Sequence, residues 1–113
     1  MNMDRFTKKS LTAIQNAQDI ALEHGNQQIE QPHLLLALVG DAEGFIPQLL
    51  TAMGLTVPSF QAAVETEVGK LPKISGPGRE SGKIYVAQDV DRALQAAGGE
   101  AQAMKDDYIS VEH

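Results

Sequence analysis

The sequence predicts an all-α domain made of two pseudo-repeated helical units. Its potential core is aliphatic: among 113 residues there are no Trp, three Phe and two Tyr, and small aliphatic side chains suit close-packed helices better than sheets. The segment Ile29–His33 has a counterpart in Ile109–His113, eighty residues later. The same ungapped offset matches Ala13, Gln15, Ala17 and Ala21 with Ala93, Gln95, Ala97 and Ala101. These matches predict an internal duplication within a single domain, residues 1–113.

The first repeat, residues 4–70, is expected to hold four helices. Asp4 is the expected cap of a helix that continues to about His24, because apolar residues recur there at steps of three and four. Its core-facing residues are predicted to be Phe6, Ala13, Ile14, Ala17 and Ala21. Pro32 favours the start of a short second helix that ends at Gly40. This helix is almost wholly apolar and must therefore be buried.

Two further helices are expected to complete this repeat. The third, residues 45–53, ends at Gly54, and the fourth, residues 57–70, has Thr56 as its expected cap. Apolar residues at helical spacing predict the core-facing positions Ile46, Leu49, Leu50, Met53, Phe60, Ala63, Val64 and Val68.

The rest of the chain is predicted to be a linker and an incomplete second repeat. Residues 71–83 contain three Gly, two Pro and two Ser, a composition typical of exposed linkers. Residues 84–113 resume the helical pattern near Ala87, and Gly98 and Gly99 are expected to weaken this helix by about 1 kcal/mol each relative to alanine. Its core-facing residues are predicted to be Val90, Ala93, Leu94, Ala97, Ala101 and Met104.

The second copy stops at His113, where the first copy continues into the apolar run Leu34–Val39. We therefore expect the second repeat to lack its last helices, and Ser110 to cap a helix whose body is absent. Apolar residues of this repeat would then face water unless another chain covers them. This predicts a less stable, association-prone domain.

Composition and charge exclude several classes of function. A formal net charge of −6 repels phosphate backbones, so nucleic acid is not an expected partner. With no Cys and three widely separated His, neither a disulfide, a metal site nor a cofactor is expected. The longest strongly apolar run is too short to span a bilayer, and the N-terminus lacks a signal-peptide pattern. We therefore expect a cytoplasmic protein without membrane contact.

One segment approaches a phosphate-binding loop but lacks its essential residues. Gly82 and Lys83 stand at the right spacing. However, Pro77 replaces the glycine whose amides wrap the phosphate, and Ile84 replaces the hydroxyl residue that holds magnesium. We therefore expect this chain neither to bind nor to hydrolyse ATP.

A repeated histidine invites a metal or acid–base interpretation. His33 and His113 take equivalent places in the two copies, but no nucleophile or second ligand recurs beside them. Hydrogen bonds to the backbone at a helix junction are therefore the favoured role for both.

An acidic patch lies near the end of the chain, where Asp106, Asp107 and Glu112 surround Tyr108. Paired carboxylates can perform acid–base chemistry. Acids at a turn and at a helix start, however, commonly act as caps and as partners of the helix dipole. The sequence therefore favours a binding module over an enzyme. In a domain of two helical repeats, the apolar groove between the halves is the expected site for an extended peptide.

Nearly the whole chain resembles the N-terminal domain of ClpB-type disaggregase chaperones, within the Clp N-domain superfamily. The resemblance rests on MDRFTKKSLTAIQNAQDIALEHGNQQIEQPHLLLAL, on the glycine-bounded stretch Gly44–Gly54, and on LPKISG and DDYISVEH. The duplicated helical block is shared by Clp ATPases generally, whereas the last two segments favour ClpB over ClpA and ClpC. The implied fold is two pseudo-repeats of four helices, joined by a linker to two ATPase modules that form a hexamer.

Site residues are implied by this resemblance only where positions match. Thr7 in the first helix, with Asp106 and Glu112 at the second-repeat turn, stands where the family keeps polar residues implicated in engaging aggregated protein. Three apolar neighbours could contact a substrate in the groove or could equally belong to the core: Phe6, Leu94 and Tyr108.

The implied function is that of a substrate-binding domain. It would bind exposed apolar segments of unfolded or aggregated proteins and present them to ATPase modules absent from this chain, without being an enzyme itself. The alternative is an N-domain of the ClpA or ClpC kind, which docks adaptor or co-chaperone proteins. A single saturable partner, rather than many unfolded ones, would distinguish that alternative.

Overall fold

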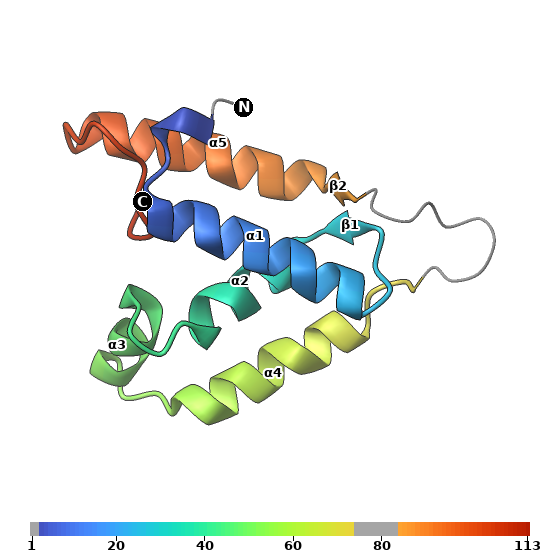
Figure 1. Ribbon diagram of the computed structural model, residues 1–113. Coiled ribbons are helices and arrows are strands. Elements are labelled where there is room, and N and C mark those ends of the chain that lie inside the picture. Colours follow the sequence, from blue (N-terminus) through green and yellow to red (C-terminus); the bar gives the residue numbers. More distant parts are fainter. Residues whose placement is uncertain (1–2, 74–83) are drawn as a thin grey trace.

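The computed structural model describes residues 3–73 and 84–113, and these residues form a mostly helical domain (Figure 1). A short 3-10 turn at Met3–Arg5 comes before the first α-helix. The further elements are α1 Lys8–Glu23, β1 Gln28–Ile29, α2 Gln31–Gly40, α3 Phe45–Ala52, α4 Val57–Gly69, β2 Tyr85–Val86 and α5 Gln88–Ala103. The all-α prediction is confirmed, since each strand in the described ranges has only two residues.

The first helix begins later than the sequence predicts. Thr7, not Asp4, is the N-cap of α1, and its side-chain oxygen accepts a hydrogen bond from the Ser10 N–H. Asp4 lies instead in the 3-10 turn. The predicted end is confirmed, because α1 stops at Glu23 and Gly25 adopts a φ of 73°, a left-handed conformation that suits glycine.

Helices α2 to α4 lie where they were predicted. Pro32 occupies the first turn of α2, where its missing N–H leaves no helical hydrogen bond unmade. Gly54 ends the third helix with a φ of 81°. Thr56 stands at the N-cap of α4, but its side chain makes no capping hydrogen bond there. The predicted position of this cap is therefore confirmed, and its predicted bond is wrong.

The core consists of three clusters of small side chains. One holds Phe6, Ala101 and Ile109 and joins α1 to α5. The other two lie in the first repeat: one contains Ala17, Ile29 and Ala37 and the other Leu36, Val64 and Val68. The short apolar helix α2 contributes to both of these, which agrees with its predicted burial.

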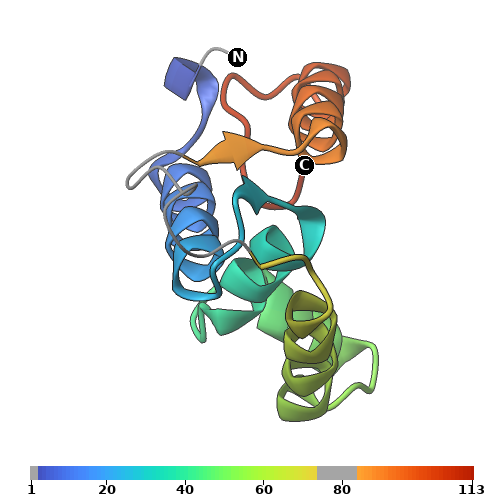
Figure 2. The same ribbon diagram turned by 90° about the vertical axis from the view of Figure 1, so that its right-hand side faces the viewer.

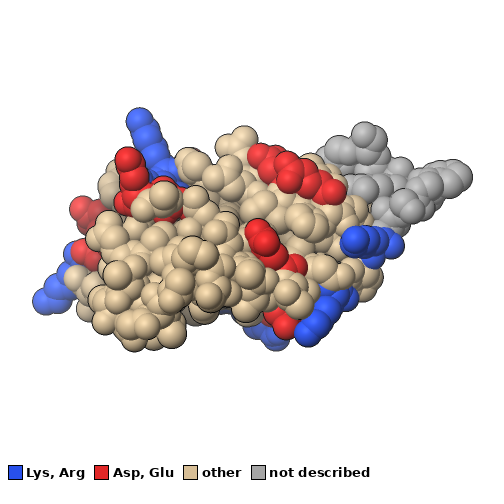
Figure 3. All heavy atoms as spheres, turned by 90° about the horizontal axis from the view of Figure 1, so that it is seen from below, with Lys and Arg blue, Asp and Glu red and all other residues tan. Residues whose placement is uncertain are grey.

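Several predicted core positions are on the surface. Leu49 is 40% exposed, Met53 63% and Met104 56%, and Ala63 and Ala93 are exposed as well. Residues 45–64 contain no Asp, Glu, Lys, Arg or His. The face formed by α3 and α4 accordingly shows a broad area without charged side chains (Figure 3). By contrast, Ala101 is fully buried, as its core-facing position predicts, although apolar residues of the second repeat were expected to face water where that repeat is incomplete.

The predicted duplication appears as two reciprocal backbone pairings. Ile29 of β1 pairs in parallel with Val86 of β2 (Figure 2), and Phe6 pairs in parallel with Ile109. The offset of eighty residues converts one pairing into the other. The Thr7 N–H donates to the Ile109 carbonyl at 3.0 Å, and the equivalent Ala87 N–H donates to the Ile29 carbonyl at 2.9 Å. Each repeat therefore contributes backbone hydrogen bonds that hold the other repeat.

Replacing Gly98 in α5 with alanine is expected to raise the free energy of unfolding by about 1 kcal/mol, through helix propensity. An added Cβ would lie 3.5 Å from Cδ1 of Ile109, an ordinary contact distance. Gly99→Ala is the matched control, because its Cβ would meet nothing within 4 Å. Urea unfolding of both variants checks the prediction. A loss of stability confined to Gly98→Ala would mean that Ile109 packs too closely to admit a methyl group.

Candidate functional site

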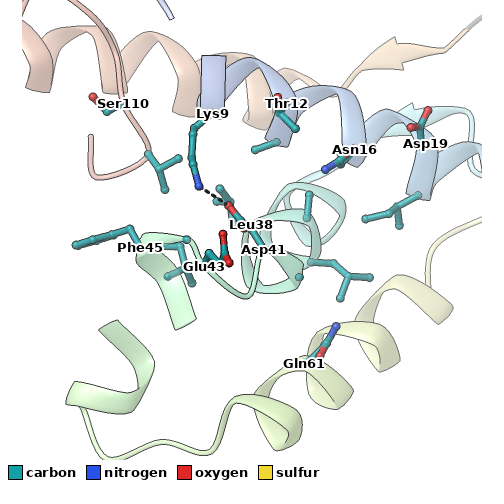
Figure 4. A pocket seen from close by; sticks show the side chains of 18 of the residues that line it. Lys9, Thr12, Asn16, Asp19, Leu38, Asp41, Glu43, Phe45, Gln61 and Ser110 are labelled. Carbon is teal, nitrogen blue, oxygen red and sulfur yellow. Dashed lines mark hydrogen bonds and ion pairs between the residues drawn. The ribbon is translucent and has the colours of Figure 1, made fainter. Parts of the chain in front are cut away.

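A groove of about 1310 Å³ lies between α1 and the helices α2, α3 and α4, with residues 110–112 at one end. Its floor is apolar and includes Ala13, Leu36 and Ala37, all buried. Figure 4 shows Lys9, Thr12 and Asn16 projecting from α1 on one side of it. The peptide-binding groove was expected between the two repeats, whereas this groove is lined mainly by residues of the first repeat.

A second, smaller cavity of about 220 Å³ does lie between the repeats. Its walls come from α1, α2, α5 and the C-terminal segment, and include Ile14, Leu38 and Ala97. This volume suits one or two side chains, whereas the larger groove has room for several residues of an extended peptide.

Thr7 lies at the groove, but its hydroxyl group already has a structural role. The Thr7 Oγ1 accepts from the Ser10 N–H at 3.3 Å and donates to the Ser10 hydroxyl at 3.0 Å. That hydroxyl in turn donates to the carbonyl of Ile109 at 3.0 Å. The chain of bonds fixes the start of α1 to the C-terminal segment, so Thr7 shapes this end of the groove.

The other two polar residues carried over by resemblance are separated. Glu112 is exposed and lines the groove with Thr7. Asp106 lines neither cavity. Its Oδ2 lies 2.7 Å from Nε2 of His113, and its side chain is 44% exposed. The structure therefore brings two of the three residues together and holds the third in a turn.

The three apolar residues also take different places. Phe6 is only 6% exposed and belongs to the core cluster with Ala101 and Ile109, where Leu94 packs against it. Both line the small cavity rather than the groove. Tyr108 is 58% exposed and lines neither hollow.

The two histidines have the backbone role that the sequence predicted. The Glu30 N–H donates to Nδ1 of His33 at 2.9 Å, and the Ser110 N–H donates to Nδ1 of His113 at 2.8 Å. Each Nε2 must then carry the proton. His33 donates it to Oδ1 of Asn26 at 2.8 Å, as His113 does to the equivalent Asp106.

His33 stays neutral in this position. Burial lowers the pKa of His33, and the electrostatic effect of nearby His24 lowers it further. Protonation would also turn Nδ1 from an acceptor into a donor facing the Glu30 N–H. The imidazole therefore serves as a structural link between α2 and the turn after α1, as its backbone partners indicate.

Three groove residues were not singled out from the sequence: Lys9, Asp41 and Phe45. Lys9 Nζ lies 3.4 Å from Oδ2 of Asp41 across the groove, and Phe45 is 46% exposed beside it. The absence of charge over residues 45–64 is a sequence signal that could have drawn attention to the apolar side. No local sequence pattern indicates that Lys9 lies close to Asp41.

Other site types find no support among the described residues. No group of three or more His, Cys, Asp or Glu is placed to hold a metal ion there. No single helix in these ranges is both long and apolar enough to cross a membrane; α2 and α3 meet that test only together, with a bend of 86° between them. The near match to a phosphate-binding loop lies outside the described ranges, except for Ile84.

Comparison with known proteins supports the resemblance. Residues 5–113 match the family model described as the Clp repeat N-terminal domain. Over 113 residues the chain is 42% identical to the chaperone protein ClpB of Nitratidesulfovibrio vulgaris, and 36% identical to that of Bacillus cereus. It spans 13% of the length of each of these relatives.

Solved structures share the fold. The N-terminal domain of Hsp104 from Candida albicans aligns with a TM-score of 0.81 at 24% identity, over 93% of this chain and 67% of that one. The N-terminal domain of ClpD from Arabidopsis thaliana aligns with a TM-score of 0.68 at 25% identity, over 96% and 72%. Because the family model matches residues 5–113 and the internal duplication is present in the structure, the chain belongs to the Clp repeat N-terminal domain family.

Proposed function

We propose that this domain binds exposed apolar segments of unfolded or aggregated proteins and presents them to ATP-driven modules of a longer ClpB-type disaggregase. The observation that carries the proposal is the groove of about 1310 Å³, whose floor is apolar and whose edge includes Thr7 and Glu112. A site for many different sequences needs apolar area without a deep pocket of fixed shape. This groove has both properties.

The surrounding surface favours a polypeptide partner over other classes. A net charge of −6 opposes nucleic acid. The ATPase modules, their hexameric assembly and a cytoplasmic location come from the resemblance to ClpB chaperones. In this arrangement the chain is a binding module, and the chemistry belongs to the modules to which it is joined.

Substituting Phe45 with serine is expected to weaken binding of an unfolded model protein about tenfold. The variant lacks the aromatic side chain at the groove edge, so the complex buries less apolar surface. Wild-type affinity should itself be weak, on the order of micromolar, since a shallow groove offers no buried anchor. Fluorescence anisotropy with a reduced, carboxymethylated protein measures both values. Circular dichroism verifies that each variant keeps its helices.

Tyr85→Ser is the matched control, because Tyr85 is an aromatic residue of similar exposure, 55%, that lines neither cavity. It should bind as the wild type does. Equal losses in the two variants would show that general surface stickiness, and not the groove, captures the substrate. Tyr108→Ser tests the remaining apolar site residue in the same assay and is expected to resemble the control.

Docking of a folded adaptor protein is the second candidate function. It would produce one saturable complex of defined stoichiometry, and no binding across a panel of unrelated unfolded proteins. If several members of such a panel bind, and Phe45→Ser weakens their binding, adaptor docking is excluded as the main role.

A further inference from the structure

The rim of the groove carries a marked excess of negative charge over its apolar floor. Six carboxylate residues line it: Asp19, Glu23, Asp41, Glu43, Glu65 and Glu112. Only two ammonium groups, Lys8 and Lys9, face them. All eight residues are exposed at the surface. The hollow therefore combines buried apolar contacts below with an uncompensated anionic edge above.

These carboxylates are too dispersed to form a metal site. They come from α1, the α2–α3 loop, α4 and the C-terminal segment, and no cluster of metal-ligating side chains is found in the described ranges. A spread of single negative charges along a groove suits single positive charges spaced along a flexible chain. Lysine and arginine side chains have this property.

Asp41 is the best-placed receptor for such a charge. Its carboxylate reaches into the groove opposite Lys9 (Figure 4), with Oδ2 3.4 Å from the Lys9 Nζ. Both side chains are substantially exposed, 64% for Lys9 and 47% for Asp41, so water screens the pair and a competing cation can replace Lys9. Lys9 thus occupies the place that an incoming basic residue would take.

Gly44 contributes to the placement of this carboxylate. A Cβ at position 44 would lie 2.8 Å from Oδ2 of Asp41, closer than such atoms approach, and would make a tight contact of 3.1 Å with the Asp41 carbonyl oxygen. The bare glycine therefore leaves the space in which the Asp41 carboxylate lies, and the Gly44 N–H donates to the Asp41 carbonyl at 2.9 Å.

We propose that the groove selects apolar polypeptide segments that carry a lysine or arginine, and that this cation replaces Lys9 at Asp41. The proposal rests on the substrate-binding function and names the class of segment within it. The apolar floor supplies the affinity, and the carboxylate rim supplies the preference and its dependence on salt.

The test uses the full 113-residue chain and three labelled peptides with one apolar core, flanked by lysine, serine or glutamate. Fluorescence anisotropy at low salt should show the lysine peptide binding about fivefold more tightly than the serine peptide, with the glutamate peptide weakest. The preference should shrink toward unity at about 0.5 M salt, because screening removes the charge effect but not the apolar contact.

Variants distinguish an effect of the carboxylates at the groove rim from an effect of the net charge of the whole chain. Asp41→Asn should remove most of the preference for lysine while leaving the affinity for the serine peptide unchanged. Lys9→Gln should raise the affinity for the lysine peptide about twofold, because Lys9 no longer competes for Asp41. Glu100→Gln is the matched control, because Glu100 is exposed on α5 and lines neither cavity.

Three results would count against the proposal in distinguishable ways. Equal binding of the lysine and serine peptides at low salt would overturn the preference and leave the substrate-binding function intact. Equal loss of preference in Asp41→Asn and Glu100→Gln would assign the effect to net charge rather than to the groove. Failure of all three peptides to bind would overturn the proposed function itself.

Discussion

Replacing His33 with alanine is expected to lower the free energy of unfolding by about 4 kcal/mol, through a buried cavity and the loss of two hydrogen bonds. The imidazole is fully buried, and it links the Glu30 N–H at 2.9 Å to the Asn26 side chain at 2.8 Å. Removing the ring leaves the Glu30 N–H and the Asn26 side chain without their hydrogen-bond partner at a buried position. Urea denaturation followed by circular dichroism measures the loss.

His113→Ala provides the comparison within the same chain. The His113 side chain is buried as well, so its removal also leaves a cavity. Its partner Asp106 is 44% exposed, however, so water can replace the hydrogen bond lost there, and a somewhat smaller loss of about 3 kcal/mol is expected. Equal losses at the two positions would show that burial of the partner does not control the effect.

The pH dependence gives a second readout for His33. Because burial lowers its pKa below the ordinary value of 6.5, the unfolded chain takes up this proton first as the pH falls. The contribution of His33 to stability is therefore complete above about pH 6.5 and is lost as the pH falls from there through the lowered folded-state pKa. The difference in stability between wild type and His33→Ala should narrow over this range.

The substitution Asn26→Asp is expected to destabilise the domain by about 3 kcal/mol, although the equivalent residue in the second repeat is an aspartate. Asn26 is only 2% exposed, and its Nδ2 donates to the Pro72 carbonyl at 2.8 Å. A carboxylate there would bury a charge and place one of its oxygens against a carbonyl oxygen. Thermal unfolding at neutral pH checks the prediction.

The reverse change, Asp106→Asn, should cost less than about 1 kcal/mol, because the half-exposed amide can still accept the His113 hydrogen bond. Together the two variants test why the duplicated position differs between the copies. If Asp106→Asn were as harmful as Asn26→Asp, the difference would have to lie in the charge at position 106 and not in the burial at position 26.

Local patterns in the sequence predicted the helices and the duplication well. Helical spacing together with Pro32, Gly40 and Gly54 placed α2 and α3 to within about a residue, because caps and breakers act over a few residues only. The equivalence of His33 and His113 predicted two junctions with the same hydrogen bonds. A duplicated sequence repeats the backbone geometry that it encodes, including the left-handed residue before each Asn26 or Asp106 position.

These local patterns did not predict contacts between residues that are far apart in the sequence. The start of α1 was wrong because Phe6 pairs with Ile109 and is therefore extended, which moves the helix start to Thr7 and its cap. Met53 has the spacing of a core residue, but α3 buries only its Pro47 and Leu50 side. Periodicity identifies an apolar face without showing whether another element covers it.

The candidate site was predicted only in part for the same reason. Thr7 and Glu112 lie at the groove, and they were found through family resemblance rather than through any local signal. Lys9 and Asp41 are 32 positions apart, and only the packing of α1 against α2 brings them together. The sequence left Phe6 open as a core residue or a groove contact, and only its packing against Ile109, at the other end of the chain, decides for the core.

The reciprocal pairings between the repeats restrict how the domain can move. Parallel backbone bonds tie the beginning of α1 to the segment after α5, and tie the beginning of α5 to the segment after α1. The two helices are thus clamped at both ends into one stiff frame, and a hinge between the halves would have to break both sets of bonds. Changes in the width of the groove are therefore expected from the helices α2, α3 and α4, which line it opposite α1.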